Sequence, residues 1–313
     1  MTGAANVSVD LAPGSYRWGD LRSHARTVLA AANVESPEAE ARWLVERAAD
    51  GAPDADAPAP ARAVGHVVDM LEQRVSGRPL QHVLGRWAFR RLELVVDHRA
   101  LIPRVETEVV AEVALEEAVR LGASRHGNDG TGGALDPSLV IADLGTGSGV
   151  LALALVDELS DVTVWATDVS PDALAVARAN LMAVGLSARR VALAEGSWFD
   201  ALPRRLRGSV HVIVSNPPYV ADDEFDALPT EVRDHEPRGA LVGGTTGLEA
   251  VREIVAGAPD WLVPAGALVV EIAPHQAAAG VDLCLDAGFA EAEVKPDLAG
   301  RDRVLVARRR GDE

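Results

Sequence analysis

The four residues Asn216, Pro217, Pro218 and Tyr219 combine groups that are well suited to hold a substrate. They follow an apolar run at residues 210–215, which predicts a buried strand. The asparagine amide offers an acceptor oxygen and a donor –NH2 group, and the prolines hold an extended backbone that lacks amide donors. The tyrosine ring offers a flat face. We interpret these residues as a site for a planar –NH2 group, with the Asn216 side-chain oxygen and the Pro217 carbonyl accepting its N–H bonds.

A nitrogen bound in this way is positioned to attack an electrophilic carbon placed in line with its lone pair. Positioning would then supply most of the catalysis. The proton can leave after the transfer, so no general base is required beforehand. We therefore assign catalysis to Asn216, Pro217 and Tyr219, and substrate binding to the same residues together with Pro218. His235 is a tempting base, but its arginine- and acid-rich loop indicates a surface position. Taken alone, the tetrapeptide is also compatible with a plain turn that ends a strand.

A glycine-rich loop, Gly145-Thr146-Gly147-Ser148-Gly149, ends another predicted strand and begins a helix. Glycines let a backbone pass close under a ligand, and a helix N-terminus presents free amide donors. The dinucleotide-binding pattern would place its third glycine one residue later, where this chain has valine, which counts against NAD or FAD. The Gly-Lys-Ser/Thr ending of a phosphate-binding loop is also missing.

Asp168 stands at the end of the next predicted strand, about twenty residues after the glycine loop, which is the spacing of a nucleoside site. An acid in this place can accept both hydroxyls of a ribose. Taken alone, Asp168 could equally cap the turn before the helix that Ser170 and Pro171 begin. Loop and acid together predict a cofactor that carries a nucleoside, without choosing which one.

From residue 139 onward, predicted strands alternate with helical patterns, which is typical of an α/β fold with a seven-stranded, mostly parallel, doubly wound sheet. The strand candidates are residues 139–144, 162–167, 190–194, 210–215, 267–272, 290–294 and 303–307. The last two should pair antiparallel, because the segment between them is too short for a helical crossover. Ligands bind at the carboxyl ends of such strands, where the strands ending at Leu144 and Ser215 should be neighbours. Asn216 should therefore face the glycine loop.

The rest of the chain suggests three further parts. Residues 15–78 carry apolar positions at helical spacing and predict a small helical-bundle domain. Residues 79–103 contain two short β-like runs and predict a β-hairpin linker. The remainder, residues 104–313, forms the catalytic domain. It should begin with a helix over about 107–121, followed by a flexible, Gly- and Asp-rich insertion at residues 122–137.

Charge and composition narrow the class of partner. The 313 residues include 30 Lys and Arg against 47 Asp and Glu, a formal net charge of −17. Such a chain repels a phosphate backbone at long range, so we expect no direct nucleic-acid binding. A single cysteine, Cys284, excludes a disulfide framework and a multi-cysteine metal site, and we expect it at a buried helix position and no bound metal. Residues 1–14 show no periodicity and are expected to be mobile. Without a secretion signal or a membrane-spanning apolar stretch, we expect a cytoplasmic protein. We also expect it to be a monomer.

Three motifs, in their order and spacing, resemble the class I methyltransferases that use S-adenosylmethionine to methylate amino groups. The motifs are DLGTGSG, ATDVSPDAL and SNPPY. Three flanking segments are PLQHVLGRWAFRRLELVVDHRALIPRVETE, EVRDHEPRGALVGGTTGLEAVREI and DLAGRDRVLVARR. These segments narrow the resemblance to the HemK-type protein-(glutamine-N5) methyltransferases of peptide chain release factors. The resemblance covers nearly the whole chain. It implies methyl transfer from S-adenosyl-L-methionine, leaving S-adenosyl-L-homocysteine, to the glutamine of a release factor's Gly-Gly-Gln motif, with the helical domain helping to dock the substrate.

The resemblance also implies roles for individual residues. The positions that match cofactor-binding positions of the family are Gly145, Thr146, Gly147, Ser148, Gly149, Asp168, Trp198, Asn216, Arg104, Glu106 and Thr107. Trp198 would lie by the adenine, and the segment from Arg104 to Thr107 would line the methionine end. Asn216 through Tyr219 would hold the substrate glutamine.

The sequence departs from the family pattern in places that leave room for another protein substrate. Val105 replaces the usual proline, Thr246 stands where aspartate is common, and Ala273-Pro274 stands where a glycine is expected. The main alternative is an N6-adenine or guanine-N2 methyltransferase of DNA or RNA, because the Asn-Pro-Pro-Tyr motif equally suits an exocyclic amine on a flipped base. Such an enzyme should carry a basic face and a target-recognition segment, and neither is visible. A non-catalytic nucleoside-binding protein is a third reading, and it would tolerate changes at Asn216.

Overall fold

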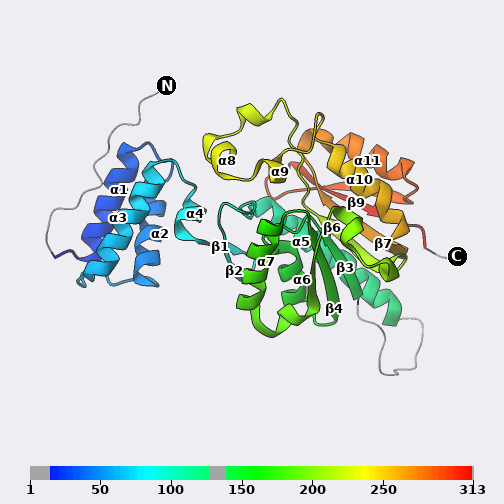
Figure 1. Cartoon of the computed structure of the whole chain (residues 1–313), viewed down its shortest axis with the longest axis horizontal. Coiled ribbons are helices and arrows are strands. Elements are labelled where there is room, and N and C mark those ends of the chain that lie inside the picture. The colour runs from blue at the N-terminus through cyan, green and yellow to red at the C-terminus, as the bar shows by residue number, and fades with distance from the viewer. Residues whose placement is uncertain (1–14, 127–138, 312–313) are drawn as a thin grey trace. The chain divides into compact units, whose positions relative to one another are not determined.

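The structure is a computed structural model in which residues 15–126 and 139–311 are described. The described chain divides into two compact units (Figure 1). The first unit contains the residues up to Arg86 together with Pro229–His235, and the second contains the rest. The expected mobility of residues 1–14 and of residues 127–137 lies outside the described part of the chain.

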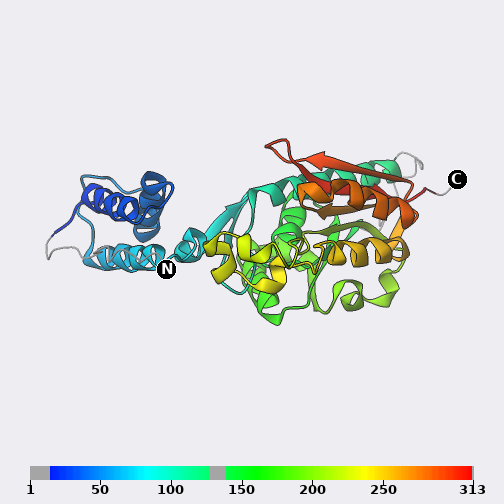
Figure 2. The ribbon, with the colours of Figure 1, turned by 90° about the horizontal axis from the view of Figure 1, so that it is seen from above.

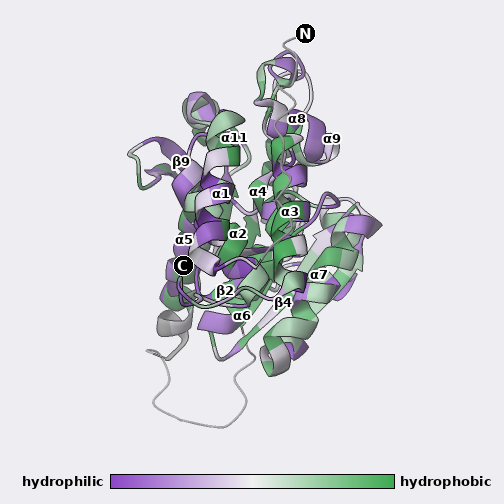
Figure 3. Cartoon of the chain, turned by 90° about the vertical axis from the view of Figure 1, so that its left-hand side faces the viewer, coloured by the Kyte–Doolittle hydropathy of each residue, from purple (hydrophilic) through white to green (hydrophobic). Residues whose placement is uncertain are grey.

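The first unit is helical, as the sequence predicts. On its first helix, the buried residues Leu21, Ala25, Val28 and Leu29 follow the helical spacing of one face. Figure 3 shows hydrophilic and hydrophobic residues side by side on these helices, as expected of helices that bury one face only. The helices of the unit are α1 (Trp18–Ala31), α2 (Pro37–Ala49), α3 (Ala61–Val75), α4 (Leu80–Leu84) and α8 (Thr230–His235).

Helix α4 lies in a segment that the sequence pattern assigned to the hairpin linker. It starts after Pro79 and ends at Gly85, whose φ of 69° lies in the left-handed region. A helix of 5 residues is too short to show periodicity, which is why the pattern missed it. The hairpin itself is confirmed: β1 (Arg86–Phe89) and β2 (Leu92–Val95) form a separate two-stranded sheet.

A buried arginine fastens α8 to the helices of the first unit. Arg74 of α3 is 7% exposed, and its Nε donates to Glu40 of α2 at 2.6 Å. Its Nη1 also donates to Glu231 of α8 at 2.7 Å. Removing one partner of such a buried pair is strongly destabilising, because it leaves an uncompensated charge. The sequence-distant segment Pro229–His235 is therefore part of this unit through a specific contact.

The second unit is built on a seven-stranded sheet with the order β5-β4-β3-β6-β7-β9-β8. Its strands are β3 (Leu139–Leu144), β4 (Val162–Asp168), β5 (Val191–Glu195), β6 (Val210–Ser215), β7 (Leu262–Glu271), β8 (Glu291–Pro296) and β9 (Asp302–Arg308). Strand β9 pairs antiparallel with both β7 and β8, and the other pairs are parallel. The predicted α/β fold, the neighbouring positions of β3 and β6 and the antiparallel last pair are all confirmed.

Strand β7 begins at Leu262, five residues before the predicted start at residue 267. The pairing with β6 shifts register there, because Val210 pairs with Leu262 whereas Val212 pairs with Ala267. Ala265, within the irregular stretch, has a φ of 59°. Pro264 and Gly266 on either side of it interrupt the apolar pattern, so no strand is predicted before the irregularity.

Helices cover both faces of this sheet (Figure 1, Figure 2). On one face lie α5 (Val105–His126), α6 (Val150–Glu158) and α7 (Pro171–Val184), and on the other lie α10 (Glu249–Gly257) and α11 (Ala277–Asp286). The shorter helices of the unit are α9 (Arg238–Leu241), η1 (Gly185–Arg190), η2 (Trp198–Ala201), η3 (Arg204–Leu206), η4 (Phe225–Ala227), η5 (Ala258–Asp260) and η6 (Pro274–Gln276). Each face of the sheet thus has its own apolar core.

Two sequence predictions concern single helices here. Helix α5 continues through His126, five residues past its predicted end, so the start of the predicted insertion at 122–137 is helical instead. Cys284 is fully buried on α11, as predicted, and burial raises the pKa of its thiol to about 12.

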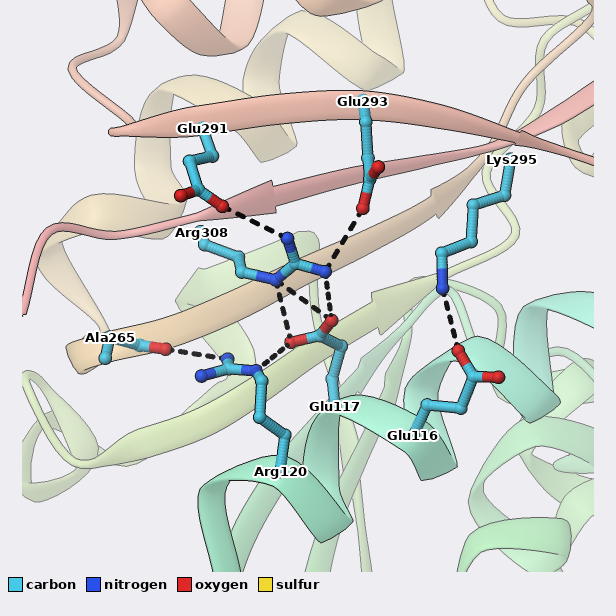
Figure 4. A network of polar contacts seen from close by, with 8 residues as sticks. All are labelled: Glu116, Glu117, Arg120, Ala265, Glu291, Glu293, Lys295 and Arg308. Atoms are coloured by element: carbon cyan, nitrogen blue, oxygen red, sulfur yellow. Dashed lines mark hydrogen bonds and ion pairs between the residues drawn. The ribbon is translucent and has the colours of Figure 1, made fainter. Parts of the chain in front are cut away.

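A network of charged residues connects α5 with the antiparallel edge of the sheet (Figure 4). Glu117 of α5, 3% exposed, accepts hydrogen bonds from Arg308 of β9 at 2.6 Å and from Arg120 at 2.7 Å. Arg308 also reaches Glu291 and Glu293 of β8. Burial alone would raise the pKa of Glu117, but the two arginines outweigh it and hold the pKa below its ordinary value.

Arg308→Ala should lower the free energy of unfolding by about 1–3 kcal/mol at neutral pH, because it leaves the buried Glu117 carboxylate with one partner. A lowered folded-state pKa contributes stability above the unfolded pKa and loses it as the pH falls through the folded pKa. The deficit should therefore shrink in acid, which urea denaturation at several pH values will measure. The control is Lys295→Ala, which removes an ion pair to the exposed Glu116 and should change stability by at most about 0.5 kcal/mol. A deficit independent of pH would contradict this account.

Candidate active site

A cavity of about 350 Å³ lies in the second unit, where β3, β4 and β6 end. The predicted site residues that line it are Arg104, Thr107, Gly145, Thr146, Gly147, Ser148, Asp168, Trp198, Asn216 and Pro218. The cavity therefore brings together the glycine loop, the acid after β4 and the start of the Asn-Pro-Pro-Tyr motif, which are far apart in the sequence. Four predicted residues, Glu106, Gly149, Pro217 and Tyr219, are not part of its lining.

The glycine loop adopts a backbone that only glycine adopts easily. Gly145, Gly147 and Gly149 have φ values of 72°, 58° and 87°, all in the left-handed region. A Cβ added at Gly145 would lie 3.2 Å from the Trp198 ring, so the loop and the indole are in close contact. The missing side chain keeps this wall of the cavity open for a ligand.

The Asp143 side chain is hydrogen-bonded to this loop. It is not among the residues predicted for the site. The side chain is fully buried, and one oxygen, Oδ2, accepts from the Thr146 hydroxyl at 2.5 Å and from the Ala152 amide at 3.1 Å. Burial raises the pKa of this carboxyl to about 7. Its position directly before the glycine loop, at the end of an apolar strand, was the signal available in the sequence.

Asp168 both braces the loops and lines the cavity. Its Oδ2 accepts from the Gly147 amide at 2.8 Å, and its Oδ1 accepts from the Ser170 amide at 2.9 Å. Burial raises its pKa, and these backbone hydrogen bonds oppose that shift in part. Each oxygen keeps further acceptor capacity for a ligand. The capping role and the ligand-binding role, which the sequence left open, are thus compatible at this one side chain.

Asn216 belongs to a buried chain of hydrogen bonds. Its Nδ2 donates to the Thr107 hydroxyl at 3.0 Å, and that hydroxyl donates to Glu271 Oε2 at 2.7 Å. The Tyr219 hydroxyl donates to the other oxygen of Glu271 at 3.2 Å. Glu271 is not among the predicted site residues, because an acid at the end of a buried strand carries no signal of its partners.

The backbone at the end of the motif is bonded by Leu241 at the end of α9, by Gly243 just after it and by Gln276 of η6. The Val220 amide donates to the Leu241 carbonyl at 3.0 Å, and the Gly243 amide donates to the Val220 carbonyl at 2.9 Å. The Gln276 side chain donates to the Tyr219 carbonyl at 3.0 Å. Gly243 lies in the segment EVRDHEPRGALVGGTTGLEAVREI, which the sequence offered only as a family resemblance. In the structure it bonds the residue directly after Asn-Pro-Pro-Tyr.

Two ion pairs at the start of α5 separate the residues predicted there. Arg104, which lines the cavity, pairs with Glu236, whose Oε2 also accepts from the Ile102 amide at 3.1 Å. Glu106 instead pairs with Arg301 at 2.8 Å. The structure therefore brings Arg104 to the cavity and leaves Glu106 outside it. Glu236 is a further residue that the sequence analysis missed.

Comparison with known proteins gives consistent results for both units. Residues 20–85 match the family described as PrmC N-terminal domain, and residues 134–231 match the family described as Methyltransferase small domain. The release factor glutamine methyltransferase of Deinococcus radiodurans is 38% identical over 301 residues, which cover 93% of this chain and 98% of that protein. The corresponding protein of Moorella thermoacetica is 40% identical over 293 residues, covering 90% and 95%.

The chain belongs to the release factor glutamine methyltransferase family. The resemblance that the motifs indicated is thereby confirmed. A solved structure, the hMettl16 catalytic domain in complex with MAT2A 3'UTR hairpin 6, has a TM-score of 0.51 at 14% identity and covers 82% of this chain and 86% of that one. This likeness bears on the methyltransferase fold alone. Across residues 15–126 and 139–311, no helix combines the length and apolar content needed to cross a membrane.

For this methyltransferase, Asp168→Ala should weaken binding of S-adenosylhomocysteine by about 10- to 100-fold, because it removes a charged acceptor from the cavity wall. Isothermal titration calorimetry measures the dissociation constant. The matched control is Asp172→Ala, which removes an exposed acid in the first turn of α7 and should leave binding unchanged. Unchanged affinity in Asp168→Ala would reject the ribose assignment.

Proposed function

We propose that this protein transfers a methyl group from S-adenosylmethionine to the side-chain amide nitrogen, N5, of the glutamine in the Gly-Gly-Gln motif of peptide chain release factors. The observation that carries the proposal is the orientation of Asn216 at the cavity. Its –NH2 group is engaged by Thr107, and among the described residues none donates to its Oδ1. An acceptor that no described residue engages, on a side chain that lines the cavity, is what an incoming –NH2 group requires.

The cavity suits S-adenosylmethionine, whose electrophilic methyl group is the chemistry that the bound cofactor supplies. The glycine loop would lie against it with backbone amides, and Asp168 would accept the ribose hydroxyls. Trp198 offers a flat surface beside Gly145 for the adenine. Arg104, Thr107 and the glycine loop line the remaining wall.

The protein's own contribution to the reaction is positioning. The nitrogen of a glutamine amide is a weak nucleophile, because its lone pair is shared with the carbonyl. Accepting its two N–H bonds at Asn216 Oδ1 and the Pro217 carbonyl would fix the nitrogen and raise the electron density on it. Tyr219 would cover the amide plane. The displaced proton can pass to water after transfer, so the chain needs no general base.

The physiological setting follows from the substrate. Release factors act in the cytoplasm, and we place the protein there, as a monomer whose first unit helps dock the release factor. The net charge of −17 supports a protein substrate over a nucleic acid.

Transfer of a tritiated methyl group tests the proposal. Label should appear on purified release factor and should be lost when the Gly-Gly-Gln glutamine of the substrate is replaced by alanine. Ribosomal RNA and DNA, offered in parallel, should stay unlabelled. Labelling of either nucleic acid in place of the release factor would overturn the proposal in favour of a base methyltransferase.

A further inference from the structure

Behind the Asn-Pro-Pro-Tyr motif lies a carboxylate that the mechanism above does not use. Glu271 ends β7, and its side chain has no exposed surface. It contacts two groups of the site: the Thr107 hydroxyl at 2.7 Å and the Tyr219 hydroxyl at 3.2 Å. Thr107 in turn accepts from Asn216 at 3.0 Å and is itself 1% exposed. We call this hydrogen-bonded series, Glu271 to Thr107 to Asn216, the relay. Its first two members are buried from solvent.

The relay has a direction, because its members differ in what they can donate. An ionised carboxylate only accepts hydrogen bonds, and a hydroxyl has a single hydrogen. Once Thr107 gives that hydrogen to Glu271, it can only accept on its other side. Asn216 must then turn its –NH2 group to Thr107, since the reversed amide would place two acceptor oxygens against each other. Oδ1 is thereby left facing the opposite way.

The accepting role of Glu271 rests on geometry, since the Thr107 and Tyr219 hydroxyls donate to its two different oxygens. Burial raises the pKa of this carboxyl, and the two hydroxyls and Arg303 oppose that shift. Arg303 of β9 lies near the carboxylate and places its guanidinium carbon 5.9 Å from the centroid of the Tyr219 ring. Burial raises the pKa of Tyr219, as does the neighbouring Glu271 charge, so the phenol keeps the proton that it donates. The like charge of Glu106 also raises the pKa of Glu271, and Glu106 is itself paired with Arg301 at 2.8 Å. One carboxylate thus holds both ends of the Asn-Pro-Pro-Tyr motif.

We propose that Glu271 is a positioning residue for methyl transfer, which acts through Thr107 to keep the Asn216 side-chain oxygen directed at the substrate nitrogen. The proposal rests on the proposed function of the site. A carboxylate with a purely structural role would stabilise the fold but would leave the direction of the Asn216 amide unaffected.

The first test is independent of any substrate. In ¹⁵N NMR spectra, the Asn216 side-chain –NH2 signal is assigned by its loss in Asn216→Ala. In the wild-type protein this group should exchange slowly with solvent, because it donates to a buried hydroxyl. In Glu271→Gln, whose amide can donate to Thr107 and release the constraint, exchange should accelerate at least about tenfold. Equal exchange in both proteins would overturn the proposal and would leave the proposed function intact.

The second test measures the rate of methyl transfer. Glu271→Gln and Thr107→Val keep side-chain volume, and each should lower kcat by about 10- to 100-fold. Glu271 does not line the cavity, so Glu271→Gln should also leave the dissociation constant for S-adenosylhomocysteine nearly unchanged. Because both act through Asn216, the double variant should lose no more than the more damaged single variant. The control, Glu253→Gln, alters an exposed acid on α10 and should keep the wild-type rate.

A conservative replacement of Thr107 tests the role of its hydroxyl. Thr107→Ser retains the hydroxyl and should recover most of the rate lost in Thr107→Val, even in a preparation where Glu271→Gln does not fold. Losses that multiply in the double variant would overturn the relay, as would a Thr107→Ser variant no more active than Thr107→Val.

Discussion

Replacing Asn216 by alanine is expected to lower kcat by about 10³-fold, while the dissociation constant for S-adenosylhomocysteine stays within about threefold of the wild-type value. The physical reason is that the variant removes the acceptor that fixes the substrate nitrogen. The loops that contact the cofactor keep their own supports, since Asp143 and Asp168 hold the glycine loop. Single-turnover methyl transfer and calorimetry measure the two quantities separately.

The matched control for this prediction is His235→Ala, which removes the histidine that was weighed as a general base. His235 does not line the cavity, so the rate should be unchanged. Equal loss of rate and cofactor affinity in Asn216→Ala would argue against its role in substrate binding. A large loss in His235→Ala would require a general base that the mechanism omits.

Gly243→Ala should lower the rate of methyl transfer by more than about 100-fold and lower the free energy of unfolding by about 1–3 kcal/mol. A Cβ at this position would lie 2.3 Å from the Pro218 carbonyl oxygen and 2.9 Å from that of Gly247. Both obstacles are backbone atoms, so relief requires the motif itself to move. Methyl-transfer rates and urea denaturation will show both effects.

The control for the glycine prediction is Gly65→Ala, on α3 of the first unit. A Cβ there meets no atom within 4 Å, and alanine has the higher helix propensity, so stability should be equal or slightly greater. Full activity in Gly243→Ala would show that the packing of Gly243 against the motif is dispensable.

The positions of the inner strands were predictable from the sequence because these strands are continuous apolar runs. Strands β3 and β6 have the predicted bounds, since a glycine loop and Asn-Pro-Pro-Tyr end them sharply. Strand β7 starts at Leu262, two residues before a Pro-Ala-Gly stretch in which the apolar pattern fails, and its start was missed. Local pattern carries no information about a register shift that only the partner strand reveals.

The site residues also fall into two groups, those with a local signal in the sequence and those identified only by long-range contacts. The glycine loop, Asp168 and Asn216 were found from residue type and spacing alone. Glu271 and Glu236 were missed, because their partners Thr107 and Arg104 lie 164 and 132 positions away in the sequence. Only the folded chain brings these groups together, and they are the ones that orient the residues the sequence identified.

Fragment mass spectrometry of the substrate tests the central claim most directly. After incubation of a release factor with the enzyme and S-adenosylmethionine, the account predicts one added methyl group on the side-chain nitrogen of the Gly-Gly-Gln glutamine. The Asn216→Ala enzyme should leave that residue unmodified. A methyl group on any other residue, or an unmodified glutamine after incubation with the wild-type enzyme, would contradict the account.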